Sequence, residues 1–498
     1  MSKDVIVIGA GFSGISLATN LAHSGYNVKV LEKNSIAGGR ARFFCENGFT
    51  FDMGPSWYWM PDVFDDYFAT FSKRTADFYE LIRLDPSYTV IFDKDNFIDI
   101  PASLEGLKEL FESIEPGGAN NLERFLKQAG HKYQVGMKDL VYRPGRSVTE
   151  FLSLQLLLDV LKIDVFKSFH SHVRKYFTHP YLLKITEFPI LFLGAVPQNT
   201  PALYSLMNYA DMQLGTWYPK GGMYKIIEGM VELAESVGVK FYYNQNASSI
   251  ILDENGSATG VATDSDIFKA EVIAASADYH HVEKNLLPKE YRTYSEKYWN
   301  SRTMAPGSLI FYLGINKKLE RLNHHNLFFD EDFGKHATEI YEKPAWPEKP
   351  LFYVSVTSKS DDSVAPKGCE NVFILVPVAP SLEDTEQIRE YYYNLIMGRL
   401  ENLTGQAIKK HVIYKRSYAH RDFITDYNAF KGNAYGLANT LKQTAIFKPA
   451  LKSAKVKNLY FTGQLTVPGP GVPPSLISGQ VVAREIERDF PISNKSLS

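Results

Sequence analysis

The sequence predicts an α/β fold in which a Rossmann-type dinucleotide-binding unit is intertwined with a second domain of mixed or antiparallel sheet and apolar helices. An apolar strand at residues 5–8 turns through glycines into a helix, and a second glycine-rich turn follows an apolar strand at 458–461. Aromatic and β-branched runs between residues 307 and 378 predict the sheet of the second domain.

The opening motif contains Gly9, Gly11 and Gly14 between a strand and a helix. Gly9 permits the tight turn, Gly11 lets the backbone approach a pyrophosphate, and Gly14 lets the helix pack on the strand. The next strand, 27–31, ends at Glu32, where a carboxylate binds ribose hydroxyls and disfavours a phosphorylated ribose. Both NAD and FAD satisfy this pattern.

Another glycine turn, shortly after Glu32, favours FAD over NAD. Gly38, Gly39 and Arg40 offer amides and a guanidinium to another face of the pyrophosphate, which a plain NAD site does not need. Gly54 and Pro55 follow, either as part of this site or as a simple turn.

The second glycine-rich turn lies near the end of the chain. A buried strand reaches Gly463, a stiff Pro/Gly loop follows, and a helix begins near Pro474. Bare backbone and helix amides at one spot suit a flat ring attached to a phosphate. The two ends of the chain therefore predict one bound flavin dinucleotide, FAD.

With these motifs and the segment 218–223, Tyr-Pro-Lys-Gly-Gly-Met, the chain resembles bacterial and fungal phytoene and carotenoid desaturases over essentially its whole length. The resemblance implies a glutathione-reductase-like FAD fold and an enzyme that desaturates a polyene by hydride transfer to flavin and proton loss. Many relatives carry Gly-Ala-Gly-Thr-His-Pro-Gly where this chain has Gly-Gln-Leu-Thr-Val-Pro-Gly at 463–469. The implied FAD-binding residues are Gly9, Gly11, Gly14, Glu32, Gly38, Gly39, Arg40, Gly54, Pro55, Ala247 at the adenine, and Gly463, Gln464, Val472 and Pro473 at the flavin.

The chain alternates between two kinds of segment. We assign residues 1–77, 219–285 and 420–498 to a discontinuous FAD-binding domain, and 78–218 and 286–419 to a substrate-binding and membrane-docking domain. Runs at 151–161 and 188–196 are too apolar for ordinary surface and too short to span a bilayer. They are either core or a shallow face that docks on a membrane and opens a lipid tunnel. Strands expected at 309–314, 351–357 and 372–378 would wall a large apolar ligand or form an ordinary sheet core.

Length and composition predict a large enzyme without nucleic-acid partners. The 498 residues are 45 % hydrophobic, enough for two domains, and a net charge of −2 gives no electrostatic case for nucleic acid. With two cysteines, no room for a signal peptide before the first strand and no long apolar run, we expect a cytoplasmic protein that contacts membranes peripherally.

The chemistry is defined partly by what the sequence lacks. It contains no metal-ligand spacing of His and Cys and no Gly-x-Ser-x-Gly motif. The histidine pairs 280–281 and 324–325 are interpreted as solvated loop residues. Orientation of a polyene and exclusion of water would supply most of the catalysis. A base would assist proton loss, but no catalytic residue is assigned among the candidates Glu187, Asp211, His170 and His172.

The resemblance favours 3,4-desaturation of a 1-hydroxylated acyclic carotenoid, with phytoene desaturation next. A carotenoid isomerase, a flavin amine oxidase and a cofactor-free prenyl-protein carrier remain alternatives on related folds. The retained glycines and Glu32 argue against the carrier. The electron acceptor is not indicated by any motif.

Overall fold

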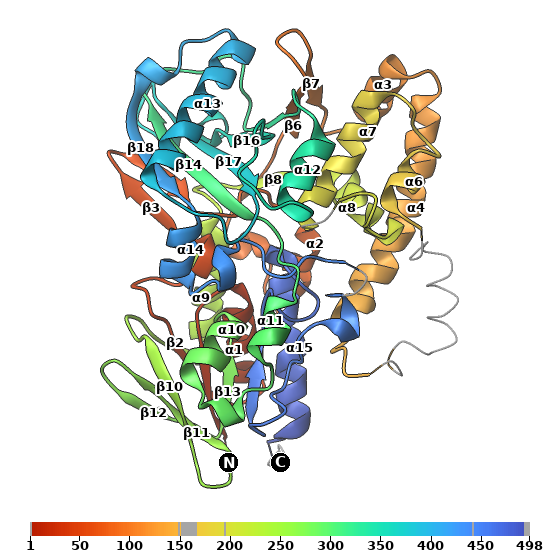
Figure 1. Ribbon diagram of the computed structural model, residues 1–498. Coiled ribbons are helices and arrows are strands. Elements are labelled where there is room, and N and C mark those ends of the chain that lie inside the picture. The colour runs from red at the N-terminus through yellow and green to blue at the C-terminus, as the bar shows by residue number, and fades with distance from the viewer. Residues whose placement is uncertain (1, 148–149, 151–166, 194–195, 441–442, 493–498) are drawn as a thin grey trace.

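The computed structural model describes residues 2–147, 150, 167–193, 196–440 and 443–492. Figure 1 shows a lower region that contains both marked ends of the chain, an upper sheet covered by a long helix, and a group of helices beside that sheet. The lower region holds the dinucleotide motifs, and the upper regions hold the segments between them.

The lower region is built on a five-stranded parallel sheet in the order β19-β13-β1-β2-β9. The central strands β1 and β13 and the edge strand β19 are almost wholly buried because each is a short apolar run, whereas the other edge strand, β9, is partly exposed. The strands are β1 (Asp4–Ile8), β2 (Asn27–Leu31), β9 (Lys240–Tyr242), β13 (Val272–Ala275) and β19 (Leu459–Phe461).

Three helices cover this sheet, and two of them come from opposite ends of the sequence. Helix α1 (Phe12–His23) contacts both α9 (Tyr224–Ser236) and α15 (Val472–Asp489). Gly479 allows the α1–α15 contact, because a Cβ there would lie 2.4 Å from the Ser13 carbonyl oxygen.

Two small antiparallel sheets border the lower region. The hairpin β3 (Phe43–Glu46) and β4 (Phe49–Asp52) is tied to the start of α9, because the Asp52 carboxylate accepts hydrogen bonds from the backbone of Met223 and Tyr224 at 2.9 and 3.2 Å. The other sheet comprises β10 (Ala247–Leu252), β11 (Ala258–Thr263) and β12 (Ile267–Lys269).

The upper region contains a seven-stranded sheet in the order β18-β14-β17-β16-β15-β6-β7, antiparallel except between β15 and β6. The predicted antiparallel strands at 309–314, 351–357 and 372–378 are confirmed as β14, β16 and β17. The bounds are β6 (Tyr88–Ile91), β7 (Phe97–Ile100), β14 (Gly307–Ile315), β15 (His325–Phe328), β16 (Phe352–Ser355), β17 (Glu370–Val378) and β18 (Val412–Tyr418).

Alternation along these strands gives the sheet two different apolar faces. Phe311, Phe328 and Ile374 share a buried cluster with residues of α13 (Glu386–Thr404), which covers one face. Ile310, Leu327 and Leu375 have the opposite parity and line a cavity on the other face. Helix α12 (Phe333–Tyr341) forms the far wall of that cavity.

The remaining helices lie mostly beside the sheet or above the lower region (Figure 1). They are α2 (Pro61–Ala69), α3 (Leu104–Ile114), α4 (Gly118–Lys138), α6 (Phe169–Val173), α7 (Pro180–Glu187), α8 (Leu206–Tyr209), α10 (Tyr279–His281), α11 (Glu296–Asn300) and α14 (His420–Tyr427). The strands β5 (Leu81–Arg83) and β8 (Trp217–Pro219) pair as a separate two-stranded antiparallel sheet.

Of the two apolar runs expected either in the core or at a membrane, the structure describes only part of one. The run at 151–161 lies outside the described residues, whereas Phe188–Leu193 forms a 3₁₀ helix in which Phe188 and Ile190 are buried. Among the described residues, no helix combines the length and apolarity needed to cross a bilayer. The strands of the five-stranded and seven-stranded sheets fall within the segments assigned to the FAD-binding and substrate-binding domains respectively, and the domain boundaries stay a prediction.

Candidate functional site

One continuous cavity joins the lower and upper regions. It begins at the turn between β1 and α1, passes the start of α15, and ends between the seven-stranded sheet and α12. We call the part near β1 and β2 the nucleotide half, and the part between the sheet and α12 the apolar half. All the predicted FAD-binding residues except Gly14 line this cavity.

Gly14 lies behind the cavity wall. A Cβ on Gly14 would approach the Gly9 carbonyl oxygen to 2.1 Å, so its hydrogen side chain lets α1 lie against β1 as the motif predicts. Gly11 precedes α1 and is different, because a Cβ there would meet no atom within 4 Å. The open space above Gly11 is therefore available to a ligand.

Glu32 is held rigidly at the end of β2. Its carboxylate accepts the Ala10 N–H at 2.9 Å with one oxygen, and the backbone and side-chain N–H groups of Asn34 at 2.9 and 2.7 Å with the other. The side chain is buried and lines the nucleotide half. Ala247, at the start of β10, lines the same half.

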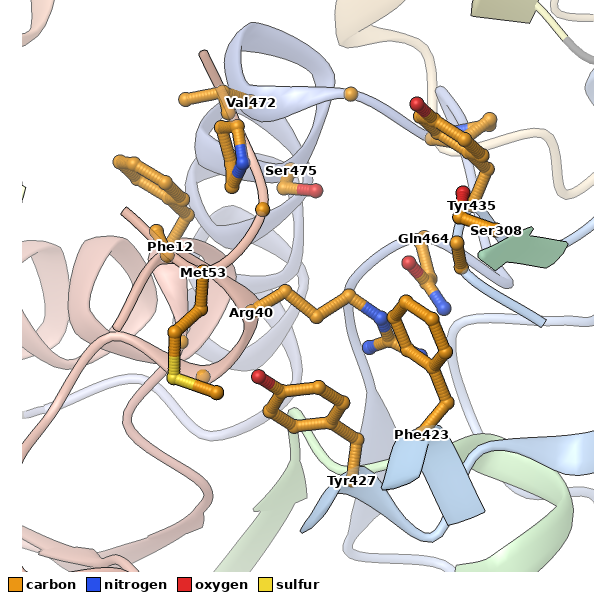
Figure 2. Close-up of a pocket in the computed structure, with 18 of the residues that line it drawn as sticks. Phe12, Arg40, Met53, Ser308, Phe423, Tyr427, Tyr435, Gln464, Val472 and Ser475 are labelled. Atoms are coloured by element: carbon orange, nitrogen blue, oxygen red, sulfur yellow. The ribbon is translucent and has the colours of Figure 1, made fainter. Parts of the chain in front are cut away.

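Arg40 is a half-buried cation in the wall of the cavity. It leaves the Gly38–Gly39 turn and extends across the cavity towards Gln464 and Phe423 (Figure 2). Its Nε atom has no hydrogen-bond partner, and an Nη atom approaches the Asn433 carbonyl oxygen at 3.5 Å. Burial lowers the pKa of Arg40 below its ordinary value, and the nearby Asp278 carboxylate opposes that shift.

The middle of the cavity lies between two loops. Gly54, Pro55 and Ser56 follow β4 on one side, and Gly463 and Gln464 follow β19 on the other. In Figure 2, Phe12, Met53 and Val472 lie on one side of this space, and Tyr435, Ser308 and Gln464 on the opposite side.

The start of α15 supplies fewer amides than its sequence position suggests. Val472 is its first residue and Gly471 precedes it with a φ of 113°. Pro473 and Pro474 carry no N–H, and the Ser475 N–H bonds the Gly471 carbonyl oxygen at 2.9 Å. Val472 is therefore the only residue among these first four helical positions whose backbone N–H can face a ligand.

The apolar half is lined mainly by aliphatic and aromatic side chains. Its polar groups include the hydroxyls of Ser308, Tyr341, Tyr353 and Tyr435, and the ring of His336. Burial raises the pKa of each of these three phenols, so they are neutral at physiological pH. This half suits a long apolar ligand, as the aromatic runs predict.

The interpretation of both histidine pairs as solvated loop residues is wrong. His280, on α10, is 9 % exposed, while His324 and His325 are 3 % and 0 % exposed. His325 begins β15, between β16 and β6 in the middle of the sheet. His281 is half-buried and lines the nucleotide half.

Sequence reasoning also missed the partners of His325. Its ring stacks on Trp57 with centroids 4.1 Å apart and planes 11° from parallel, and its Nδ1 lies 2.6 Å from the Tyr353 hydroxyl. Trp57 and Tyr353 both line the cavity. The alternation of β16 is a signal that could have placed Tyr353 on this face, but nothing local indicated Trp57 or His325.

None of the four candidate bases lines the described cavity. Asp211 is buried and accepts hydrogen bonds from Tyr88 at 2.8 Å and Thr216 at 3.4 Å. Glu187 pairs with Arg174 and approaches His170 at 3.2 Å. His172 lies 3.3 Å from the Lys132 ammonium.

The residues of the nucleotide half fit a dinucleotide. The space above Gly11 is open, the guanidinium of Arg40 has a buried Nε without a hydrogen-bond partner, and Glu32 presents a fixed carboxylate. A pyrophosphate would add a counter-charge for Arg40 to the one that Asp278 already provides.

Comparison with known proteins shows the family to which this chain belongs. The model of the flavin-containing amine oxidoreductases matches residues 12–487. A carotenoid 3,4-desaturase of Haloarcula japonica is 39 % identical over 98 % of this chain and 99 % of its own length. A zeta-carotene-forming phytoene desaturase of Myxococcus xanthus is 30 % identical over 97 % of this chain and 94 % of its own.

The fold is also found among solved structures. An oxidoreductase from Methanosarcina mazei superposes with a TM-score of 0.61 at 17 % identity, covering 97 % of this chain and all of that protein. At this identity the likeness concerns the fold alone.

Proposed function

Since this chain belongs to the carotenoid desaturases among the flavin-containing amine oxidoreductases, we propose a specific reaction for it. As an FAD-dependent oxidoreductase, it would introduce the 3,4 double bond into an acyclic carotenoid end that carries a 1-hydroxyl group. The observation that carries the proposal is the single cavity that joins the nucleotide half to a long apolar half. The 39 % identity to the Haloarcula enzyme over nearly the whole chain favours the 3,4 position.

Residues of the nucleotide half and of the middle of the cavity would hold FAD. Glu32 would bind the ribose, Gly11 and Arg40 the pyrophosphate, and Ala247 would meet the adenine through its backbone. The loops at Gly54–Pro55 and Gly463–Gln464, with Val472 and Pro473, would enclose the flavin end. When bound, the oxidised flavin supplies the two-electron acceptor that desaturation requires.

The other residues orient the polyene and exclude water. Leu327, Ile310 and Leu375 form a flat floor on the sheet, and α12 covers it. Burial of a polyene between these surfaces keeps water from an electron-poor carbon chain, and it fixes one end of the chain near the middle of the cavity.

We also propose that the protein binds membrane surfaces peripherally, since a carotenoid must enter from lipid. Phe188 and Met207 line the cavity on the side of the helical group, and Phe447 is 56 % exposed. Flotation with liposomes tests this; a protein that stays unbound at every lipid composition would contradict it.

The substrate is tested by anaerobic incubation of FAD-loaded protein with liposomes that carry a 1-hydroxylated acyclic carotenoid or phytoene. Flavin bleaching with the hydroxylated substrate, and a product with one more conjugated double bond, are expected. Bleaching with phytoene alone would favour the second candidate, phytoene desaturation, which the Myxococcus relative supports. No bleaching with either would favour an isomerase or amine oxidase.

A further inference from the structure

Desaturation removes two hydrogens from neighbouring carbons, and the flavin accounts for only one of them with its electron pair. The other leaves as a proton and needs an acceptor inside a closed cavity. This inference rests on the proposed desaturase function, which supplies the oxidant. We therefore asked which described cavity residues can take a proton.

Most titratable groups that line the cavity are committed elsewhere. His336 has both nitrogens occupied, because Nδ1 accepts the Leu351 N–H at 3.1 Å and Nε2 lies 2.9 Å from the Pro377 carbonyl oxygen. The carboxylate of Asp426 pairs with Arg42 at 2.8 Å, and Glu32 already accepts three hydrogen bonds from Ala10 and Asn34 in the nucleotide half.

Asp278 and Tyr341 are also poor acceptors. Asp278 accepts the backbone N–H groups of His281 and Phe430 at 3.1 Å each, and its charge interacts with Arg40. The Tyr341 hydroxyl is buried without a hydrogen-bond partner, so it has nowhere to pass its own proton.

Tyr353 differs because a basic side chain lies directly behind it. Its hydroxyl is 2.6 Å from His325 Nδ1, and β15 and β16 fix both residues on the cavity face of the sheet. The stacked Trp57 ring prevents His325 from turning away. With the phenol as donor, Nδ1 is the acceptor and the imidazole proton resides on Nε2, which has no partner.

We propose that Tyr353 and His325 accept the proton that the substrate loses. Bound FAD would supply the acceptor for the first hydrogen and its bonding pair, and the polyene would then carry a delocalised positive charge. The C–H bond of the neighbouring carbon then breaks, and its electron pair forms the new C=C bond. The proton passes to Tyr353 Oη while the phenol proton passes to His325 Nδ1, which leaves a neutral tyrosine and an imidazolium.

A weak buried base is adequate for this step. Burial, and secondarily the neighbouring His324, lower the pKa of His325 well below its ordinary value, so the ring is neutral and ready to accept. A carbon next to a polyene cation is far more acidic than an imidazolium, so proton transfer is downhill once the cation has formed.

The test uses the FAD-loaded full chain and three variants. Tyr353→Phe removes the hydroxyl and keeps the ring. His325→Asn keeps an acceptor for the phenol, but an amide oxygen cannot hold the proton. Tyr88→Phe is the matched control, because Tyr88 also contacts Trp57 and bonds a buried acceptor, Asp211, yet does not line the cavity.

Three quantities are measured: anaerobic flavin bleaching in a single turnover, the kinetic effect of deuterium at the carbon that loses the proton, and carotenoid binding to enzyme whose flavin was reduced beforehand. We expect Tyr353→Phe and His325→Asn to slow product formation by about 100-fold, with an increased isotope effect. Binding to the reduced enzyme stays at the wild-type level, and Tyr88→Phe behaves like wild type in all three.

Two results would overturn the inference. Either full-speed turnover with an unchanged isotope effect in Tyr353→Phe, or wild-type rates in His325→Asn, shows that the pair does not take the proton. If Tyr353→Phe fails to fold, His325→Asn decides alone. If none of the carotenoids tested bleaches the flavin of the wild-type enzyme, that result would instead refute the proposed function.

Discussion

Replacing Glu32 with glutamine tests whether this residue supports the fold as well as the cofactor. Its two oxygens serve different partners: one accepts the Ala10 N–H, and the other accepts two N–H groups of Asn34. Glutamine has one acceptor oxygen and one NH₂ group. Whichever way the amide turns, its NH₂ faces another donor, either the buried Ala10 N–H or the part-buried N–H groups of Asn34.

The expected cost follows from those contacts. With the amide oxygen towards Asn34, the buried Ala10 N–H loses its acceptor, and the charge that strengthens all three hydrogen bonds is also lost. An unsatisfied buried donor costs about 1–3 kcal/mol and a bond to a charged group contributes about 1.5–3 kcal/mol, so we expect a loss of about 2–4 kcal/mol even without FAD.

The assay is urea unfolding of FAD-free Glu32→Gln beside wild type, followed by FAD titration monitored by flavin fluorescence. Glu46→Gln, on the exposed edge of β3, is the control and should unfold like wild type. We expect FAD affinity to fall by about tenfold, or about 1.4 kcal/mol. A FAD-free variant within about 0.5 kcal/mol of wild type would refute the reasoning, since surface changes have effects of that size.

Three further predictions concern two glycines of the first turn and Asp211. Gly11→Ala should leave the unfolding temperature of the FAD-free protein unchanged and abolish flavin binding, because its Cβ meets no protein atom but occupies the open space of the nucleotide half; retained binding would contradict this. Gly14→Ala should destabilise the fold by about 3 kcal/mol or more in thermal unfolding, since its Cβ would lie 2.1 Å from the Gly9 carbonyl oxygen. Burial raises the pKa of Asp211 from 3.8 to about 7, so the native state keeps a proton that the unfolded chain loses, and stability falls as pH rises through this window. Asp211→Asn keeps an acceptor for Tyr88 and does not titrate. Its free energy of unfolding should therefore rise relative to that of wild type by about 1–4 kcal/mol as pH increases from about 4 to 7. A difference that stays constant across this range in urea unfolding would contradict the raised pKa.

The cofactor end of the molecule could be predicted from sequence because its signals are local. A strand, a glycine turn and a helix are neighbours along the chain, so Gly9, Gly11 and Gly14 carry their own context. The strands β14, β16 and β17 were also predictable, since each contains a run of aliphatic and aromatic residues.

The chemistry of the apolar half could not be predicted in this way. The burial of His325 depends on β15 pairing with β6, which comes from the first hundred residues, and on Trp57 from the loop after β4. Such contacts depend on register between distant segments, and a pair of adjacent histidines looks the same in a loop. The two prolines of α15 could be read as helix starters, but their effect on the amide supply became clear only with the helix boundary.

The meeting of α1 with α15 and of β13 with β19 has a consequence for the order of folding. The sheet under the cofactor closes only when residues 459–489 reach the strands and helix formed by residues 4–31. Pairing across so large a separation is slow, because the chain loses much entropy before contacts compensate it. During refolding from urea, Trp346, whose ring packs against Tyr392 and His420 from nearer segments, would therefore become buried early. Flavin fluorescence quenching would follow as the last kinetic phase.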